Sequence, residues 1–267
     1  MKLDKAKLDN LYNKYMNKSF IEKDPVQFIH LFSGSKKDQE VVGFIASALS
    51  FGKRDKIIIS IKEVLSHLGL EPFKSLFYFK IKDISRLESF IYRFIKGIDI
   101  IQLFYRIHIV LNKYKSLENL FGEGFKKDNS IKTSVTHFVD VFNSINLSNS
   151  MFQTEEDRTR TSKFLIPSPI GGSACKRLNL YLRWMVRKDL VDIGIWDSIP
   201  QNALLIPVDT HVARVSKSLS LTERKSADWR MAEEITKRLK EFNPDDPVKY
   251  DFALFGYGID YQKSEIN

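Results

Sequence analysis

The sequence predicts an all-α protein. Nearly every periodic stretch repeats its apolar residues every three to four positions, which places them on one face of a helix. We find no alternating apolar and polar strands joined by Asn-Gly turns. A chain of 267 residues with 43% hydrophobic and 12% aromatic residues can build a buried core. We therefore expect about ten helices.

The helices of the N-terminal half are predicted from their apolar stripes. Residues 8–16 place two leucines and two tyrosines on one face, and residues 38–52 carry a stripe that begins at an acidic end. Residues 56–70 form another stripe, although the isoleucine run inside it is also compatible with a strand. The remaining helices of this half are predicted over 85–95, 98–114 and 131–145.

The C-terminal half reads the same way. Four amphipathic stretches predict helices over 175–190, 210–219, 229–242 and 247–258. Polar, glycine-rich or proline-rich segments between the helices predict loops at 32–38, 121–130, 148–162, 167–173 and 242–246.

Charge and cysteine content narrow the functional classes. The formal net charge of +9 favours a polyanionic partner, nucleic acid first and an anionic membrane surface second. The alternative is a lysine-rich genome that would give the same number without any partner. A single cysteine can form neither an internal disulfide nor a four-cysteine cluster, so we expect a cytosolic protein. We expect neither a signal peptide nor a membrane span, because no apolar segment is long enough.

Residues 166–189 combine a glycine turn with a basic helix. Gly171 and Gly172 allow a tight turn, and Ser173 is a good N-cap for the helix that follows. Backbone N–H groups exposed at such a helix start bind phosphate. Lys176 lies in the first turn, with Arg177 beside it. The alternative is a capped amphipathic helix whose charged face is only solvated.

A second helix start carries a carboxylate. Asp209 occupies the N-cap position before the helix predicted over 210–219, directly after the apolar residues 203–208. It is therefore expected at the edge of the core. A buried lysine near other cations, such as Lys176, can lose its proton and act as a nucleophile, and an ionised carboxylate could steady the charge that forms. The plainer alternative is that Asp209 is only a cap.

The segment VDTHVARVSKSLSL, residues 208–221, resembles the Val-Asp-Thr-His-Val segment of the helix-hairpin-helix DNA glycosylase superfamily, endonuclease III type. In that superfamily the aspartate is catalytic, and a lysine at the start of the second hairpin helix forms the Schiff base of the bifunctional members. The resemblance thus assigns these roles to Asp209 and Lys176. Residues 40–56 and 246–258 resemble the opening helix and the closing helix of the superfamily.

The sequence also departs from the superfamily pattern. The hairpin reads SPIGGSACK instead of Leu-Pro-Gly-Val-Gly-x-Lys, the gap between Lys176 and Asp209 is longer, and the four-cysteine iron–sulfur loop is absent. These features are similar to the archaeal 8-oxoguanine glycosylase branch and to a related bacterial family of unknown function. The resemblance implies two packed helical lobes with a cleft between them. One lobe would span 36–196 and carry the hairpin, and the other would combine 1–35 with 197–267.

The resemblance further implies residues that handle the DNA. Asp251 and Phe255 on the closing helix would accept N–H groups of a flipped base and stack on it, although a core phenylalanine and an exposed aspartate are an equal alternative. Phe51, Lys53 and Arg54 would form a wedge and a phosphate clamp. The hairpin residues Gly171, Gly172 and Ser173, together with Arg177, would contact the backbone. Packing roles are expected for Trp184, Trp229, His211 and Cys175.

The expected function is therefore base-excision repair. The resemblance implies a DNA glycosylase with AP-lyase activity, acting as a monomer on double-stranded DNA with a damaged base, 8-oxoguanine by analogy, at the nucleoid in the cytoplasm. No metal or iron–sulfur cofactor is expected, although the hairpin can hold a monovalent cation in this superfamily. Two alternatives remain: a non-catalytic helix-hairpin-helix DNA-binding protein, and a helical interaction protein without a DNA partner.

Overall fold

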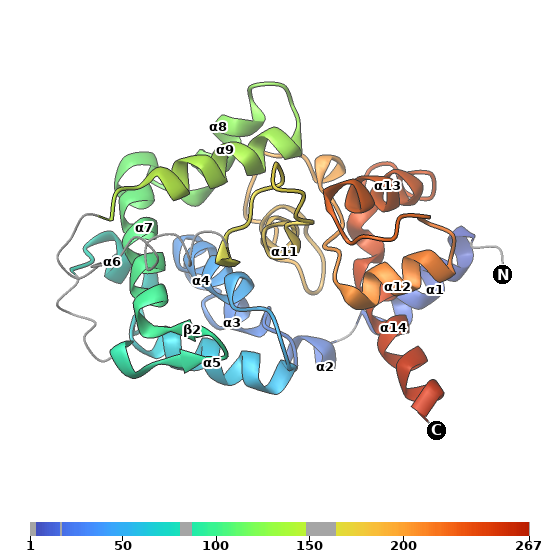
Figure 1. Cartoon of the computed structure of the whole chain (residues 1–267), viewed down its shortest axis with the longest axis horizontal. Coiled ribbons are helices and arrows are strands. Elements are labelled where there is room, and N and C mark those ends of the chain that lie inside the picture. Colours follow the sequence, from blue (N-terminus) through green and yellow to red (C-terminus); the bar gives the residue numbers. More distant parts are fainter. Residues whose placement is uncertain (1–3, 17, 81–86, 148–163, 267) are drawn as a thin grey trace. The chain divides into compact units, whose positions relative to one another are not determined.

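The computed structural model is mostly helical, as the sequence predicted, and describes residues 4–16, 18–80, 87–147 and 164–266 (Figure 1). The chain folds into two compact units. Residues 23–168 form the central unit, and residues 1–22 together with 169–267 form the terminal unit. Helix predictions over 98–114, 131–145, 210–219 and 229–242 are confirmed to within a few residues.

The unit boundaries differ from the predicted lobes. The lobes were expected over 36–196 and over 1–35 plus 197–267, whereas the structure divides the chain after residues 22 and 168. The difference moves the hairpin and Lys176 out of the central segment. Lys176 consequently belongs to the same unit as Asp209.

The central unit is built around α4. Its elements are α3 (Gln27–Leu31), α4 (Lys36–Ala48), α5 (Arg54–Ser66), α6 (Pro72–Phe77), β1 (Ile91–Tyr92), β2 (Ile95–Lys96), α7 (Gly97–Tyr114), α8 (Leu117–Phe125) and α9 (Ile131–Ser144). The acidic start of α4 caps two other helices. Asp38 accepts a hydrogen bond from the Phe73 N–H at 2.8 Å, and the Glu40 carboxylate accepts from the N–H groups of Leu117 and Glu118 at 3.1 and 2.9 Å. Each cap satisfies N–H groups that a helix start leaves open.

Two expectations for the central unit were wrong. Residues 91–96, within the helix predicted over 85–95, form an antiparallel hairpin that pairs Ile91 with Lys96 and Tyr92 with Ile95. Tyr92 and Ile95 face each other across the hairpin and are buried, while Ile91 is 72% exposed, because neighbouring residues of a strand point to opposite faces. The loop predicted over 121–130 overlaps the end of α8, because Phe121 and Phe125 bury their rings despite the glycines between them. The loop predicted over 148–162 lies outside the described residues.

The terminal unit brings together both ends of the chain. Its elements are α1 (Lys5–Tyr15), α2 (Lys18–Ile21), α11 (Lys176–Val186), η2 (Gln201–Ala203), α12 (Thr210–Ser218), α13 (Trp229–Lys240), η3 (Pro247–Tyr250) and α14 (Asp251–Ile266). Helix α14 packs against both α1 and α12 (Figure 1). Gly256 makes this close approach possible, since a Cβ added there would lie 2.4 Å from the Tyr15 ring. Asp9 of α1 also ties α1 to η3, by accepting from Lys249 at 2.8 Å and from the Tyr250 hydroxyl at 3.0 Å.

Candidate functional site

Helix α11 begins at Lys176. The residue before it, Cys175, has left-handed backbone angles (φ 46°, ψ 39°), and its carbonyl accepts the first helical hydrogen bond from Asn179 at 2.9 Å. The expectation that Ser173 caps this helix was wrong, because the Ser173 hydroxyl instead accepts from the Cys175 N–H at 3.1 Å. The turn before it is tight, with Gly172 at φ 79°. Lys176 therefore stands at the first position of a helix that has no side-chain cap, and its side chain is half-buried.

Helix α12 begins with Asp209 as its N-cap, as predicted. The carboxylate oxygen Oδ1 accepts from the Val212 N–H at 2.8 Å. Residues 204–208 before it are buried, and the Ile206 N–H donates to the Thr236 hydroxyl of α13 at 3.1 Å. The second carboxylate oxygen, Oδ2, has no hydrogen-bond partner among the described residues. Asp209 is thus held by one oxygen and open at the other, on a half-buried side chain.

Helix α14 begins with Asp251, whose carboxylate is buried. Its Oδ2 pairs with Nη1 of Arg183, and the side chain is only 8% exposed. Burial raises the pKa of Asp251 to about 6, with the negative charges of Asp209 and Asp192 adding to the rise and the positive charges of Arg183 and Lys176 opposing it. The alternative of an exposed Asp251 was therefore wrong.

These three helix starts all belong to the terminal unit. Lys176 of α11 and Asp209 of α12 both act electrostatically on the carboxylate of Asp251 at the start of α14. That Lys176 and Asp209 share one catalytic site stays a prediction. The N-terminal ends of helices carry partial positive charge, which favours carboxylates and disfavours cations at these positions.

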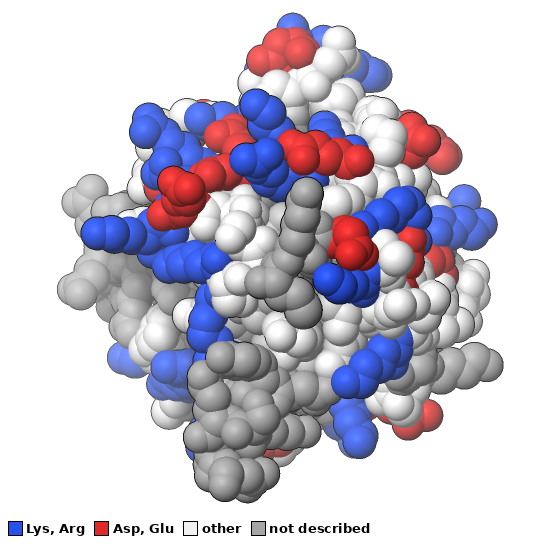
Figure 2. Space-filling view, turned by 90° about the vertical axis from the view of Figure 1, so that its right-hand side faces the viewer, with Lys and Arg blue, Asp and Glu red and all other residues white. Residues whose placement is uncertain are grey.

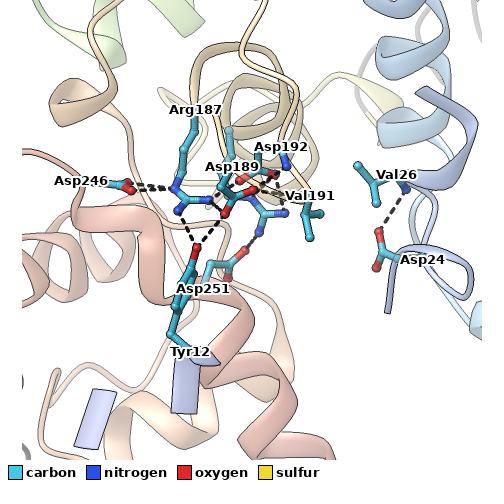
Figure 3. Close-up of polar contacts among 10 residues, drawn as sticks. Tyr12, Asp24, Val26, Arg187, Asp189, Val191, Asp192, Asp246 and Asp251 are labelled. Carbon is cyan, nitrogen blue, oxygen red and sulfur yellow. Dashed lines mark hydrogen bonds and ion pairs between the residues drawn. The ribbon is translucent and has the colours of Figure 1, made fainter. Parts of the chain in front are cut away.

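A buried cluster of ion pairs around Arg187 is connected to Asp251 through Asp192 and Arg183. Arg187 donates to both oxygens of Asp246 at 3.0 and 2.8 Å and lies 2.8 Å from Asp192 (Figure 3). It also pairs with Asp189, whose Oδ2 accepts from the Tyr12 hydroxyl of α1 at 3.0 Å. This cluster was not predicted from the sequence. The basic residues of α11 were expected on a solvated face or on a DNA-binding helix, yet Arg187 is only 3% exposed.

Phe255 lies one turn after Asp251 and is half-buried. Its ring contacts the ring of His211 edge-on, with centroids 5.9 Å apart, and that of Phe20 at 6.1 Å. The packing role expected for His211 agrees with this contact. Phe255 is neither a fully buried core residue nor an open stacking surface in the chain alone. Trp184 and Trp229 are buried at 0% and 2% exposure, which confirms their packing roles.

Two neighbours of Lys176 are buried. Cys175 is 0% exposed, and burial raises the pKa of its thiol to about 12, which confirms the expected inert thiol. Arg177 is 9% exposed, and burial lowers its pKa to about 10. The phosphate contact expected of Arg177 stays a prediction, and little of its side chain is exposed for it in the chain alone. Gly171 and Gly172 are exposed, as backbone contacts to a phosphate would require.

The predicted wedge residues belong to the central unit. Phe51 packs its ring against Tyr92 at 5.0 Å and against Phe164 at 4.9 Å, so its side chain is part of an aromatic cluster. Lys53 is exposed directly before α5, and Arg54 is half-buried at its first position. The structure does not relate these residues to Lys176, which lies in the other unit.

The surface charge is mixed on the face shown in Figure 2. Lysine and arginine side chains there alternate with aspartate and glutamate side chains over white apolar and neutral areas. Ion pairs of the terminal unit such as Arg224–Asp228 at 2.8 Å and Arg238–Glu241 at 3.1 Å combine both signs in the same way.

In the part of the chain that the structure describes, no three histidine, cysteine, aspartate or glutamate side chains gather closely enough to hold a metal ion. None of the described helices combines the length and the apolar composition that a bilayer span requires.

Comparison with known proteins identifies a family. The family model described as "Protein of unknown function (DUF2400)" matches residues 24–260, which include Lys176, Asp209, Asp251 and Phe255. Searches of curated proteins and of solved structures found no match. Because the family model covers most of the chain, this protein belongs to the DUF2400 family of proteins of unknown function.

Proposed function

We propose that the protein is a bifunctional DNA glycosylase and AP lyase of the helix-hairpin-helix superfamily, acting on duplex DNA with a damaged base. The observation that supports the proposal is that Lys176 and Asp209, at the starts of α11 and α12 in one unit, both act electrostatically on the buried carboxylate of Asp251. An amine and an open carboxylate at one location are the groups that Schiff-base chemistry at a sugar carbon requires. The proposal includes a monomer in the cytoplasm and 8-oxoguanine as the base, by analogy with the archaeal branch.

In the proposed reaction, the damaged nucleotide turns out of the duplex and its base enters the site. The ammonium group of Lys176 first loses its proton. The neutral amine then attacks C1′ of the sugar while the bond from C1′ to the base breaks, and the departing base takes a proton. Oδ2 of Asp209, which has no partner in the described chain, faces the developing positive charge and can accept a proton from the attacking amine.

The second half of the reaction opens the sugar. The C1′–O4′ bond breaks, O4′ takes a proton, and an imine forms between C1′ and the Lys176 nitrogen. Loss of a proton from C2′ then expels the 3′ phosphate and nicks the strand. Asp209 is well suited to carry protons in these steps, because the Val212 N–H fixes one oxygen at 2.8 Å and leaves the other available.

Borohydride trapping tests the proposal. Wild-type protein mixed with duplexes that contain 8-oxoguanine or an abasic site should form a covalent complex on reduction, visible as a shifted band on a denaturing gel. Lys176→Gln should abolish the band, and Asp209→Asn should slow single-turnover base release by about 100-fold or more. Lys188→Gln provides the matched control, since Lys188 is an exposed lysine just after the same helix.

The outcomes separate the alternatives. A covalent band of equal strength in wild type and Lys176→Gln would remove Lys176 from the nucleophile role. Salt-sensitive duplex binding without any band in the wild type would favour the non-catalytic DNA-binding alternative.

A further inference from the structure

Asp251 differs from the other carboxylates of the buried ion-pair cluster in how many of its oxygens are hydrogen-bonded. Asp192 uses both oxygens, one toward Arg183 Nε at 3.2 Å and one toward Arg187 Nη1 at 2.8 Å. Asp246 gives both oxygens to Arg187, and both oxygens of Asp189 also accept hydrogen bonds. In the described part of the chain, Asp251 is hydrogen-bonded only through Oδ2, to Arg183, so its Oδ1 is left without a partner.

This asymmetry points to a ligand. Ion pairs that serve only the fold can satisfy both carboxylate oxygens, as Asp192 does. The unpaired Oδ1 of Asp251 is not completely buried, so a group from outside can reach it. The Asp251 side chain retains 8% exposure, against 0% for Asp192. A group that enters beside Lys176 and Asp209 and donates N–H would complete the hydrogen bonding of Asp251.

Arg183 fixes the direction in which Asp251 points. It lies two turns after Lys176 on α11, is 2% exposed, and stacks its guanidinium over the Phe252 ring at 4.1 Å. Its planar fork spans Asp192 through Nε and Asp251 through Nη1, which leaves little rotational freedom. Asp192 is in turn held by Arg187. The buried ion pairs therefore fix the orientation of Arg183, and Arg183 fixes that of Asp251.

The charges that face Asp251 come from several elements. Arg183 and Lys176 of α11 are positive, while Asp209 of α12 and Asp192 after α11 are negative. Four other described groups on or next to these elements are engaged elsewhere. Lys249 bonds to Asp9, Arg214 donates to the Gly258 carbonyl, Asp246 pairs with Arg187, and the His211 ring contacts Phe255. Arg183 is thus the cation that directly bonds to Asp251.

We propose that Arg183 is a positioning residue that holds Asp251 as an ionised carboxylate with Oδ1 presented to the N–H edge of an extruded base. This inference rests on the proposed function and extends it to the class of base recognised. Purines and damaged purines whose Watson–Crick edge carries N–H donors fit the acceptor, while an edge that offers only acceptors is repelled.

The test compares the pH dependence of base release in variants that remove the positive charge of Arg183 or the negative charge of Asp192. Asp251 has to be ionised to accept N–H, so single-turnover base release should fall on the acid side as Asp251 takes up a proton near pH 6. Arg183→Gln removes a positive charge and should move this acid limb to higher pH by about one unit or more. Asp192→Asn removes a negative charge and should move it to lower pH, and Arg183→Lys should stay near the wild-type position.

A second readout does not need catalysis. The carboxyl carbon of Asp251, recognised as the NMR signal that Asp251→Asn removes, should titrate in the free protein with shifts in the same directions as the rate. If Asp251 of the wild type titrates as expected but the wild type never forms an imine, the proposed enzyme activity is refuted and the role of Arg183 toward Asp251 stands. Titration midpoints that coincide in Arg183→Gln and Asp192→Asn, or move the same way, would overturn the role of Arg183. A structural defect lowers amplitudes in both variants but does not move them in opposite directions.

Discussion

At the scale of single residues, the site depends on which polar atoms are satisfied and which stay open. Asp209 and Asp251 each commit one carboxylate oxygen, to a backbone N–H and to a guanidinium respectively. The other oxygen of each has no hydrogen-bond partner within the described ranges. Fixing one oxygen removes rotational freedom before a substrate arrives, which is how a site is preorganised.

The cysteine next to Lys176 gives a residue-scale prediction. Cys175 is 0% exposed and burial raises its pKa to about 12, so the reactive thiolate is scarce at neutral pH. We expect a thiol reagent such as iodoacetamide to leave the native protein unlabelled over hours and to label one thiol per chain in denaturant. Mass spectrometry measures both. Rapid labelling of the native protein would mean that the start of α11 opens readily.

Residue roles were predictable where the cause is local. The N-cap role of Asp209 follows from the residues on either side of it, and so does the buried thiol of Cys175. The burial of Arg183 and Arg187 could not be predicted, because Asp251 and Asp246 lie 68 and 59 residues further along the chain. A helix rich in arginine looks the same in sequence whether its charges meet solvent or distant aspartates.

At the scale of elements, helix starts organise the terminal unit. Asp228 caps α13 by accepting from the Met231 N–H at 2.8 Å, and its backbone bridges to Ser173 in the turn before Lys176. The start of α13 therefore supports the loop that leads into the site. The caps of α12 and α13 both use aspartate, whose negative charge also suits the helix N-terminus.

The α13 cap can be tested by two substitutions at one position. Asp228→Ala removes the cap and the ion pair with Arg224, and should lower the free energy of unfolding by about 1–2 kcal/mol. The melting temperature should fall by roughly 2–4 °C for each kcal/mol lost. Asp228→Asn keeps the capping oxygen and should remain within about 0.5 kcal/mol of the wild type. Thermal unfolding followed by circular dichroism measures both, and equal losses in the two variants would show that the cap is not what Asp228 contributes.

Elements were predictable in proportion to their length and periodicity. The long stripe over 98–114 became α7, Gly97–Tyr114, almost unchanged. The hairpin at 91–96 escaped prediction because two strands of two residues each are too short to display a clear two-residue period. The boundary between the units also escaped, since it depends on which helices pack together rather than on a change in composition.

At the scale of the whole molecule, the question is what the net charge of +9 is for. The face in Figure 2 carries basic and acidic side chains together, and exposed cations would form the electrostatic footprint for DNA. The central unit offers exposed cations next to the Phe51 cluster, with Lys53 among them. Exposed backbone at Gly171 and Gly172 adds contacts that need no side-chain charge.

Duplex binding by the full chain should therefore weaken as salt rises, since each phosphate contact releases condensed counterions. We expect the affinity for an undamaged duplex to fall roughly ten- to a hundredfold between about 50 and 200 mM salt. Lys53→Gln should reduce the slope of log affinity against log salt by about one, the value for one lost phosphate contact. Lys240→Gln, an exposed lysine at the end of α13, should leave the slope unchanged and controls for net charge alone. Fluorescence anisotropy of a labelled duplex gives the slopes. Equal reductions of the slope in both variants would show that Lys53 acts only through the net charge. The absence of salt-dependent binding to duplex DNA would favour the alternative of a helical protein without a DNA partner.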